Sequence, residues 1–148
     1  MFSEKPEQIR ADLHLLIVLR RILASAEPEE GCALLLGRRF DVAWQLCLVW
    51  PCCNVWPLPQ QRCRRFAIDP REQLQAQKWG RGQGLELLGS AHSHPTNEAV
   101  PSSTDLSLCG ISTLMVILGA QNLGGELVAW WLPEAPAPPL RLPWRMGA

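Results

Sequence analysis

The stretch GSAHSHPTNEAVPSSTDLSL, residues 89–108, holds two of the three histidines of the chain. A mostly apolar run, residues 85–88, leads into it, and Pro95 directly follows His94. This pattern predicts a buried strand that ends at the proline, and side chains two residues apart in a strand point to the same face. His92 and His94 are therefore predicted to lie side by side at the end of a strand, where two imidazoles can reach one metal ion.

Ser102 and Asp105 follow at an interval that has two interpretations. Ser-x-x-Asp at the start of a helix is similar to a capping box, in which the serine oxygen and the carboxylate accept hydrogen bonds from free backbone N–H groups. Alternatively, Asp105 turns back toward the two histidines as a third ligand, which leaves a fourth tetrahedral position for water, as in catalytic zinc sites. Both interpretations can hold together, because a helix start fixes both side chains. The plain alternative is a polar strand end followed by an ordinary helix cap.

Around this stretch, the apolar pattern predicts one mixed α/β domain, residues 1–148, with a central sheet. Strands are predicted over residues 32–37, 41–50, 64–68, 85–94, 114–120 and 126–133. Helices are predicted over residues 6–27, 69–84 and 102–112. The first helix has an apolar stripe of Ile9, Leu13, Leu16 and Ile17, and the second has Asp69 as its N-cap. The proline-rich segment 134–148 is predicted to run over the surface, with one edge strand at residues 139–142.

Composition narrows the classes of function. The 148 residues are 47% hydrophobic, which fits a domain with its own core, and 14 basic and 14 acidic residues balance, which argues against nucleic-acid binding. The N-terminal residues 1–21 carry charges of both signs and an apolar run too short to span a bilayer, with no secretory cleavage pattern. We therefore expect a cytoplasmic protein without membrane attachment. In that compartment the six cysteines are expected to be free thiols that neither form disulfides nor bind zinc.

The pattern His-x-His, seven residues, Ser-x-x-Asp resembles the signature of the JAMM metallopeptidases of the MPN (JAB) family. The residues that match it are His92, His94, Ser102 and Asp105. The family also has an upstream glutamate before a cysteine and an apolar strand, and the stretch PEEGCALLLG, residues 28–37, is similar to it. The stretches CCN, FAIDP and VAWW match further along the chain and in the same order. Ala33 departs from the glycine that the family often has after the cysteine.

The resemblance implies roles for these residues. His92, His94 and Asp105 would hold one Zn²⁺ with a bound water molecule. Glu30, aligned by its spacing from Pro28, would accept the proton of the water and pass it to the leaving amine, although Glu27 and Glu29 lie close to it. Ser102 would donate a hydrogen bond to the oxyanion, with Ser103 as the neighbouring alternative.

The resemblance also implies a fold and a function. The fold would be a central mixed sheet flanked by about three helices, with a cytidine-deaminase-like architecture. The function would be zinc-dependent hydrolysis of a peptide or isopeptide bond after the Gly-Gly C-terminus of a ubiquitin-like or sulfur-carrier protein. Two alternatives are a non-catalytic MPN scaffold that binds partner proteins, and a metal-dependent amidase acting on a small molecule or a cell-wall peptide.

The end of the predicted strand also indicates how a substrate would bind. Because this strand ends at Pro95, we expect the metal ion to lie beside an open sheet edge, where an extended tail can pair with the backbone.

Overall fold

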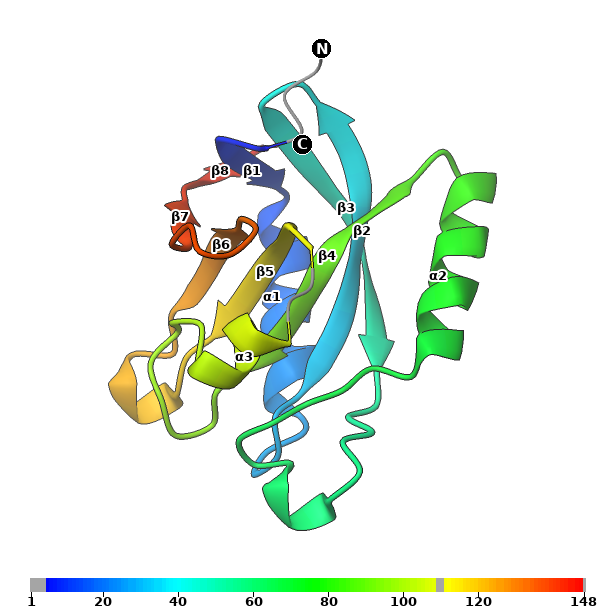
Figure 1. Ribbon diagram of the computed structural model, residues 1–148. Helices are drawn as coiled ribbons and strands as arrows, with labels where there is room; N and C mark the ends of the chain where they lie inside the picture. Colours follow the sequence, from blue (N-terminus) through cyan, green and yellow to red (C-terminus); the bar gives the residue numbers. More distant parts are fainter. Residues whose placement is uncertain (1–4, 109–110, 148) are drawn as a thin grey trace.

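The computed structural model describes residues 5–108 and 111–147, which form a mixed α/β domain (Figure 1). The strands are β1 (Gln8–Ala11), β2 (Cys32–Phe40), β3 (Ala43–Cys52), β4 (Glu86–Ser93), β5 (Thr113–Leu118), β6 (Leu127–Leu132), β7 (Leu140–Leu142) and β8 (Trp144–Met146). The helices are α1 (Leu13–Ala24), α2 (Pro70–Gly82) and α3 (Ser103–Ser107), with single 3₁₀ turns at Pro59–Gln61 and Gln121–Leu123. The predicted fold class, a central mixed sheet with about three helices, is confirmed.

All the strands belong to one sheet, in the order β7-β6-β5-β4-β2-β3-β1-β8. Strand β4 lies inside it, parallel to β5 and antiparallel to β2. Trp44 of β3 and Trp131 of β6 nevertheless touch edge to face, with ring centroids 5.5 Å apart. Four strand spacings separate these two strands, about 19 Å in a flat sheet. The sheet is therefore strongly curled, which brings its two end strands, β7 and β8, close enough to be joined through Pro143 alone.

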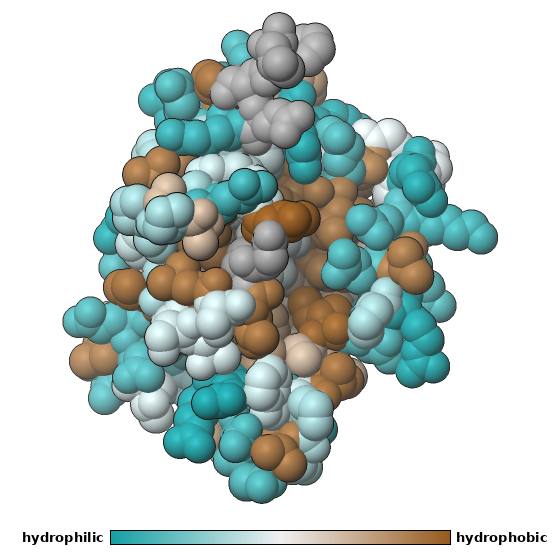
Figure 2. Space-filling view, viewed as in Figure 1, coloured by the Kyte–Doolittle hydropathy of each residue, from teal (hydrophilic) through white to brown (hydrophobic). Residues whose placement is uncertain are grey.

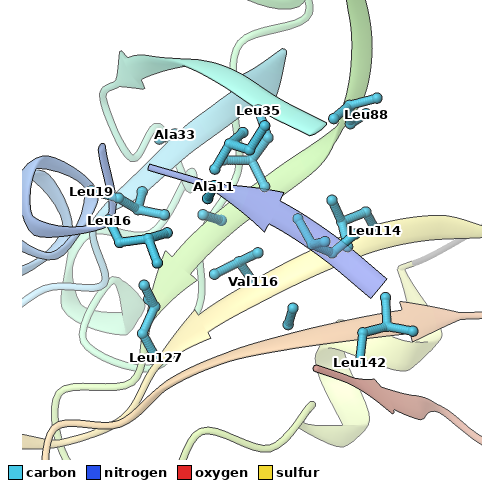
Figure 3. Packing of buried hydrophobic residues seen from close by; sticks show 14 of the residues in the cluster. Ala11, Leu16, Leu19, Ala33, Leu35, Leu88, Leu114, Val116, Leu127 and Leu142 are labelled. Atoms are coloured by element: carbon cyan, nitrogen blue, oxygen red, sulfur yellow. The ribbon is translucent and has the colours of Figure 1, made fainter. Parts of the chain in front are cut away.

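The main hydrophobic core fills the inner face of this curled sheet. Helix α1 contributes Leu16, Leu19 and Leu23, which are buried against strand residues such as Leu35 and Val116 (Figure 3). Helix α2 packs separately, with Ala76 in a smaller cluster, and stands apart from α1 in Figure 1. No helix in the described ranges is long and apolar enough to cross a membrane.

The first predicted helix begins later than expected. Asp12 is its N-cap, with a side chain that accepts a hydrogen bond from the N–H of His14, and the four residues before it form β1. Ile9 is buried in that strand, whereas Leu13 and Ile17 are exposed on α1, so the predicted apolar stripe is wrong. The pairing of β1 with β3 and β8 outweighs the helical pattern, because it buries Ile9 in the closed sheet.

Two further expectations about strands need correction. Residues 64–68 are expected to pair in the sheet, but Arg64 lies in a turn and the other four residues belong to no helix or strand. The end of β4 does not lie beside an open sheet edge, because β2 and β5 cover both of its sides. The predicted edge strand at residues 139–142 is confirmed as β7, while β8 was not predicted.

Candidate metal centre

His92 and His94 lie at the end of β4 and are almost completely buried. The side chain between them points to the opposite side of the sheet: Ser93 Oγ accepts a hydrogen bond from the N–H of Gly31 at 2.8 Å and contacts the Leu23 carbonyl at 3.4 Å. This anchor fixes the register of the strand end against α1 and the start of β2. As predicted from the His-x-His pattern, both imidazoles then face the same side.

Asp105 completes a compact triangle with the two imidazoles. The Nε2 atoms of His92 and His94 are 3.1 Å apart, and Asp105 Oδ2 lies 3.1 Å from the first and 3.2 Å from the second. Three ligand atoms held tetrahedrally at about 2.0–2.1 Å from zinc would be about 3.3 Å apart. The spacing and the buried position of the three donors therefore fit a metal ion.

Both histidines have defined surroundings on the side away from the triangle. The Nδ1 of His94 lies 2.8 Å from the carbonyl oxygen of Glu98 and donates to it, so Nε2 is the ring nitrogen that faces the triangle. The ring of Phe66 stacks on His92, with centroids 4.4 Å apart and planes inclined by 21°. The Nδ1 of His92 has no hydrogen-bond partner among residues 5–108 and 111–147, so Phe66 holds this ring by packing.

The charges of the triangle suit metal binding. Burial lowers the pKa of His92, which favours the neutral imidazole that a metal needs. Burial acts against ionisation of Asp105 as well, but the hydrogen bonds from His92 and His94 outweigh it and hold the pKa of this carboxyl well below its usual range. For His94, burial is outweighed by the hydrogen bonds to Asp105 and Glu98, which raise its pKa. Asp105 is therefore an ionised ligand beside two imidazoles.

Glu30 lies just before β2 in the same cleft as His94 and Ser102, a hollow of about 390 Å³. It is 4% exposed, and its Oε1 is buried without a hydrogen-bond partner in the described parts of the chain. Burial raises the pKa of Glu30 to about 8, with smaller opposing effects from His94, which lowers it, and Asp105, which raises it. Of the three neighbouring glutamates, Glu30 is the one that lines this cleft, whereas Glu27 and Glu29 do not.

Ser102 is the N-cap of α3 and forms the predicted capping box with Asp105. Its Oγ accepts the N–H of Asp105 at 3.0 Å, and its own N–H donates to Asp105 Oδ2 at 2.9 Å. The hydroxyl hydrogen of Ser102 is used in neither bond and is available to a group in the cleft. Ser103, the alternative, is exposed and does not line the cleft.

Asn54 was not predicted to belong to the site. Its side-chain amide donates to the carbonyl oxygens of Glu30 at 3.0 Å and Arg65 at 2.9 Å, and its oxygen accepts from the N–H groups of Trp56 and Ala67. Asn54 thereby ties the segment that carries Phe66 to the backbone of Glu30. An asparagine just after a strand was the available signal, but the segments that it joins are distant in sequence or irregular.

Comparisons with known proteins place the chain in a family. Residues 12–133 match the family model described as prokaryotic homologs of the JAB domain. The curated protein named desampylase, from Pyrococcus furiosus, is 38% identical over 69 residues, which are 47% of this chain and 48% of that protein. The match thus spans about half the length of the relative.

Two solved structures share the fold over most of the chain. A protein of Desulfitobacterium hafniense superposes with a TM-score of 0.81 at 26% identity, covering 95% of this chain and 93% of the other. A protein of Salinibacter ruber gives a TM-score of 0.64 at 30% identity, with 89% and 87% covered. Because the family model spans most of the chain and includes every residue of the metal centre, the protein belongs to the prokaryotic homologs of the JAB domain.

Proposed function

We propose that this protein is a zinc-dependent hydrolase that cuts a peptide or isopeptide bond after the Gly-Gly C-terminus of a ubiquitin-like or sulfur-carrier protein. The observation that carries the proposal is the buried triangle of His92, His94 and Asp105 beside the unpaired carboxylate oxygen of Glu30. A structural cap at the end of β4 would need no such carboxylate. Metal-dependent hydrolysis uses both a metal site and a nearby group that exchanges a proton.

Two imidazoles and one carboxylate at this spacing suit Zn²⁺, and three protein ligands are the usual number in its catalytic sites. When bound, zinc supplies Lewis acidity, which makes a water molecule a better nucleophile and a carbonyl a better electrophile. His92, His94 and Asp105 would hold it, and the Glu98 carbonyl and Phe66 would keep the two rings oriented.

Glu30 and Ser102 would do the remaining work. A glutamate whose pKa is raised to about 8 by burial can take and return a proton near neutral pH, so Glu30 would accept the proton of water and deliver it to the leaving amine. The Ser102 hydroxyl, which has a free hydrogen, would donate to the scissile carbonyl oxygen as negative charge develops on it. Both residues line the same cleft, so they can act on one substrate.

The substrate class rests on the relative and on the form of the site. The matched protein of Pyrococcus furiosus is named for removing a ubiquitin-like modifier, which supports a carrier protein of that kind. Both histidines are buried, so a substrate with little side-chain bulk next to the cut, such as a Gly-Gly tail, can approach most closely.

The state of the cysteines supports the cytoplasm as the location of the protein. Free thiols are found at Cys32, Cys47, Cys52, Cys53 and Cys63, while Cys109 lies outside the described residues.

The test is cleavage of a carrier protein extended beyond its Gly-Gly terminus by one amino acid, followed by mass spectrometry. We expect the zinc-loaded protein to release the extension, and chelated protein and His94→Ala to lose both zinc and activity. His14→Ala removes an exposed histidine of α1 and serves as the matched control, with zinc and activity unchanged. Activity that persists at a normal rate in chelated protein would overturn the proposal, and activity on small amides alone would favour the amidase.

A further inference from the structure

A second cleft borders the metal centre and differs in character from the one that holds Glu30. It measures about 370 Å³, and its walls include Trp56, Phe66, Leu108 and Met115. Leu108 is 62% exposed at its rim. Figure 2 shows apolar side chains on the surface beside α3.

The apolar cleft is continuous with the metal centre. Asp105, one of the three candidate ligands, forms part of its wall, and Phe66, which stacks on His92, forms another part. The two clefts share no lining residue: the Glu30 cleft mixes polar residues such as Arg64 and Asn97 with apolar ones such as Val100, and the second cleft has mostly apolar walls. The candidate ligands therefore lie between a hollow of mixed character and an apolar one.

The position of Glu30 gives the substrate a direction. If Glu30 delivers the proton to the leaving amine, that amine lies on the side of the Glu30 cleft. The acyl part of the substrate must then leave the centre on the other side. We infer that the apolar cleft of Trp56, Phe66, Leu108 and Met115 receives an apolar side chain of the carrier tail, from a residue preceding its Gly-Gly terminus. This inference rests on the proposed function.

The reach of an extended chain limits which residue this can be. Each residue spans about 3.3 Å, so two glycines cover about 7 Å, and the third residue from the cut is the first with a side chain. Successive side chains of an extended chain point to opposite sides. The third and the fourth residues therefore cannot both enter the cleft, and one of these two positions should show a strong preference for an apolar side chain.

The test uses four carrier tails that differ in having Leu or Ser at the third or the fourth position before the cut. With the zinc-loaded protein, we expect kcat/KM to be at least tenfold higher for Leu than for Ser at one of the positions and the same at the other. Binding of the matching product tails to metal-free protein, measured by titration calorimetry, should follow the same order.

Variants of exposed leucines then place the effect in the cleft. Leu108→Ser should reduce the preference to less than threefold while keeping its zinc content. Leu108→Met should retain the preference. The matched control is Leu106→Ser, which alters an exposed leucine of α3 that does not line the cleft and should retain the full preference.

Three outcomes would overturn the inference. These are equal rates on all four tails, equal preferences at both positions, or an undiminished preference in Leu108→Ser. Each of them leaves the proposed hydrolysis intact, because the tails are still cleaved. Failure of the zinc-loaded wild-type protein to cleave any tail would instead overturn the proposed function, and this inference with it.

Discussion

Glu30 carries the most informative single atom of the structure. Its Oε1 is buried without a hydrogen-bond partner in the described chain, and an unsatisfied buried polar group costs about 1–3 kcal/mol. A residue with only a structural role would be replaced by an apolar side chain at lower cost. The arrangement is intelligible if water or a substrate amine occupies the place next to this oxygen during the reaction.

Replacement of Glu30 should separate metal binding from chemistry. Glu30→Gln keeps the size of the side chain and removes the proton acceptor, so we expect zinc content to stay the same while kcat falls by about 10²–10⁴. Zinc analysis and initial rates on the extended carrier measure the two effects. Glu29→Gln is the matched control, because Glu29 does not line the cleft, and it should keep the wild-type rate. The reverse result would assign the role to Glu29.

The same residue should govern how the stability of the metal-free protein depends on pH. Burial raises the pKa of Glu30 from 4.5 to about 8, so between these values the folded protein keeps a proton that the unfolded chain has lost. The unfolded state binds fewer protons, and the free energy of unfolding therefore falls as pH rises through this window, by roughly 5 kcal/mol at most.

Glu30→Gln has no charge to bury and should escape this loss. Chelated wild-type and Glu30→Gln proteins should have similar unfolding free energies near pH 4.5, and the variant should be the more stable at pH 8.5. Urea denaturation across this range measures the difference. Parallel pH profiles for the two proteins would show that Glu30 ionises in the folded state as freely as in the unfolded chain.

The side chains of the triangle could be predicted from sequence, and those that support them could not. The His-x-His pair and the Ser-x-x-Asp step are local patterns whose geometry follows from one strand and one helix start. Phe66 and Asn54 act across long sequence separations, on His92 and on Glu30. Their roles depend on how the segment of residues 53–69 folds over the site, and no periodicity in that segment indicates it.

At the scale of elements, α3 shows how a helix too short to be stable by itself can position a ligand. It has five residues, well below the length at which an isolated helix forms in water. Its capping box joins Ser102 and Asp105 through two hydrogen bonds, and the same Oδ2 atom faces both histidines. The helix start and the third ligand are therefore one unit.

Ser102→Ala and Asp69→Ala compare two N-caps that differ in this respect. Each removes a side chain that accepts a backbone N–H, in α3 and α2 respectively, and each should cost about 1 kcal/mol of stability. Only Ser102→Ala should also weaken zinc binding, by about tenfold, and lower kcat by about 10²–10³. Thermal denaturation, zinc titration and rate measurements separate these effects. Equal zinc affinities in the two variants would argue against the coupling of cap and ligand.

The accuracy of the predicted elements follows from how local their signals are. Helix α2 was expected at residues 69–84 and occurs at Pro70–Gly82, because its cap and first turn are fixed by neighbouring residues. The segment of residues 64–68 is expected to be a strand, and Phe66 and Ile68 do alternate there with polar or small residues. These side chains are instead partly buried by stacking on His92 and by packing near α2, which gives the same alternation without strand pairing.

At the scale of the whole molecule, the strong curl of the sheet could not be predicted. Strands β1 and β8 have four and three residues, and each pairs with segments far away in sequence. Such short strands have little intrinsic signal, and their pairing is determined by the curl of the sheet as a whole. The indole N–H of Trp144 donates to the carbonyl of Leu127 at 2.9 Å, so a second contact ties the C-terminal strands back to β6.

The C-terminal strands should therefore stabilise the domain through the core rather than through the metal centre. Leu142 of β7 is 5% exposed and packs in the main cluster, whereas Leu140 of the same strand is 38% exposed. Leu142→Ala leaves a cavity in a closed core and should lower the unfolding free energy by about 2–5 kcal/mol. Leu140→Ala, the matched control, should change the unfolding free energy by about 0.5 kcal/mol or less.

Neither Leu142 nor Leu140 lines the two clefts, so both variants should keep wild-type zinc content and kcat at temperatures where they remain folded. Urea denaturation and zinc analysis of the two variants test this, and a loss of zinc from folded Leu142→Ala would show instead that closure of the sheet positions the ligands.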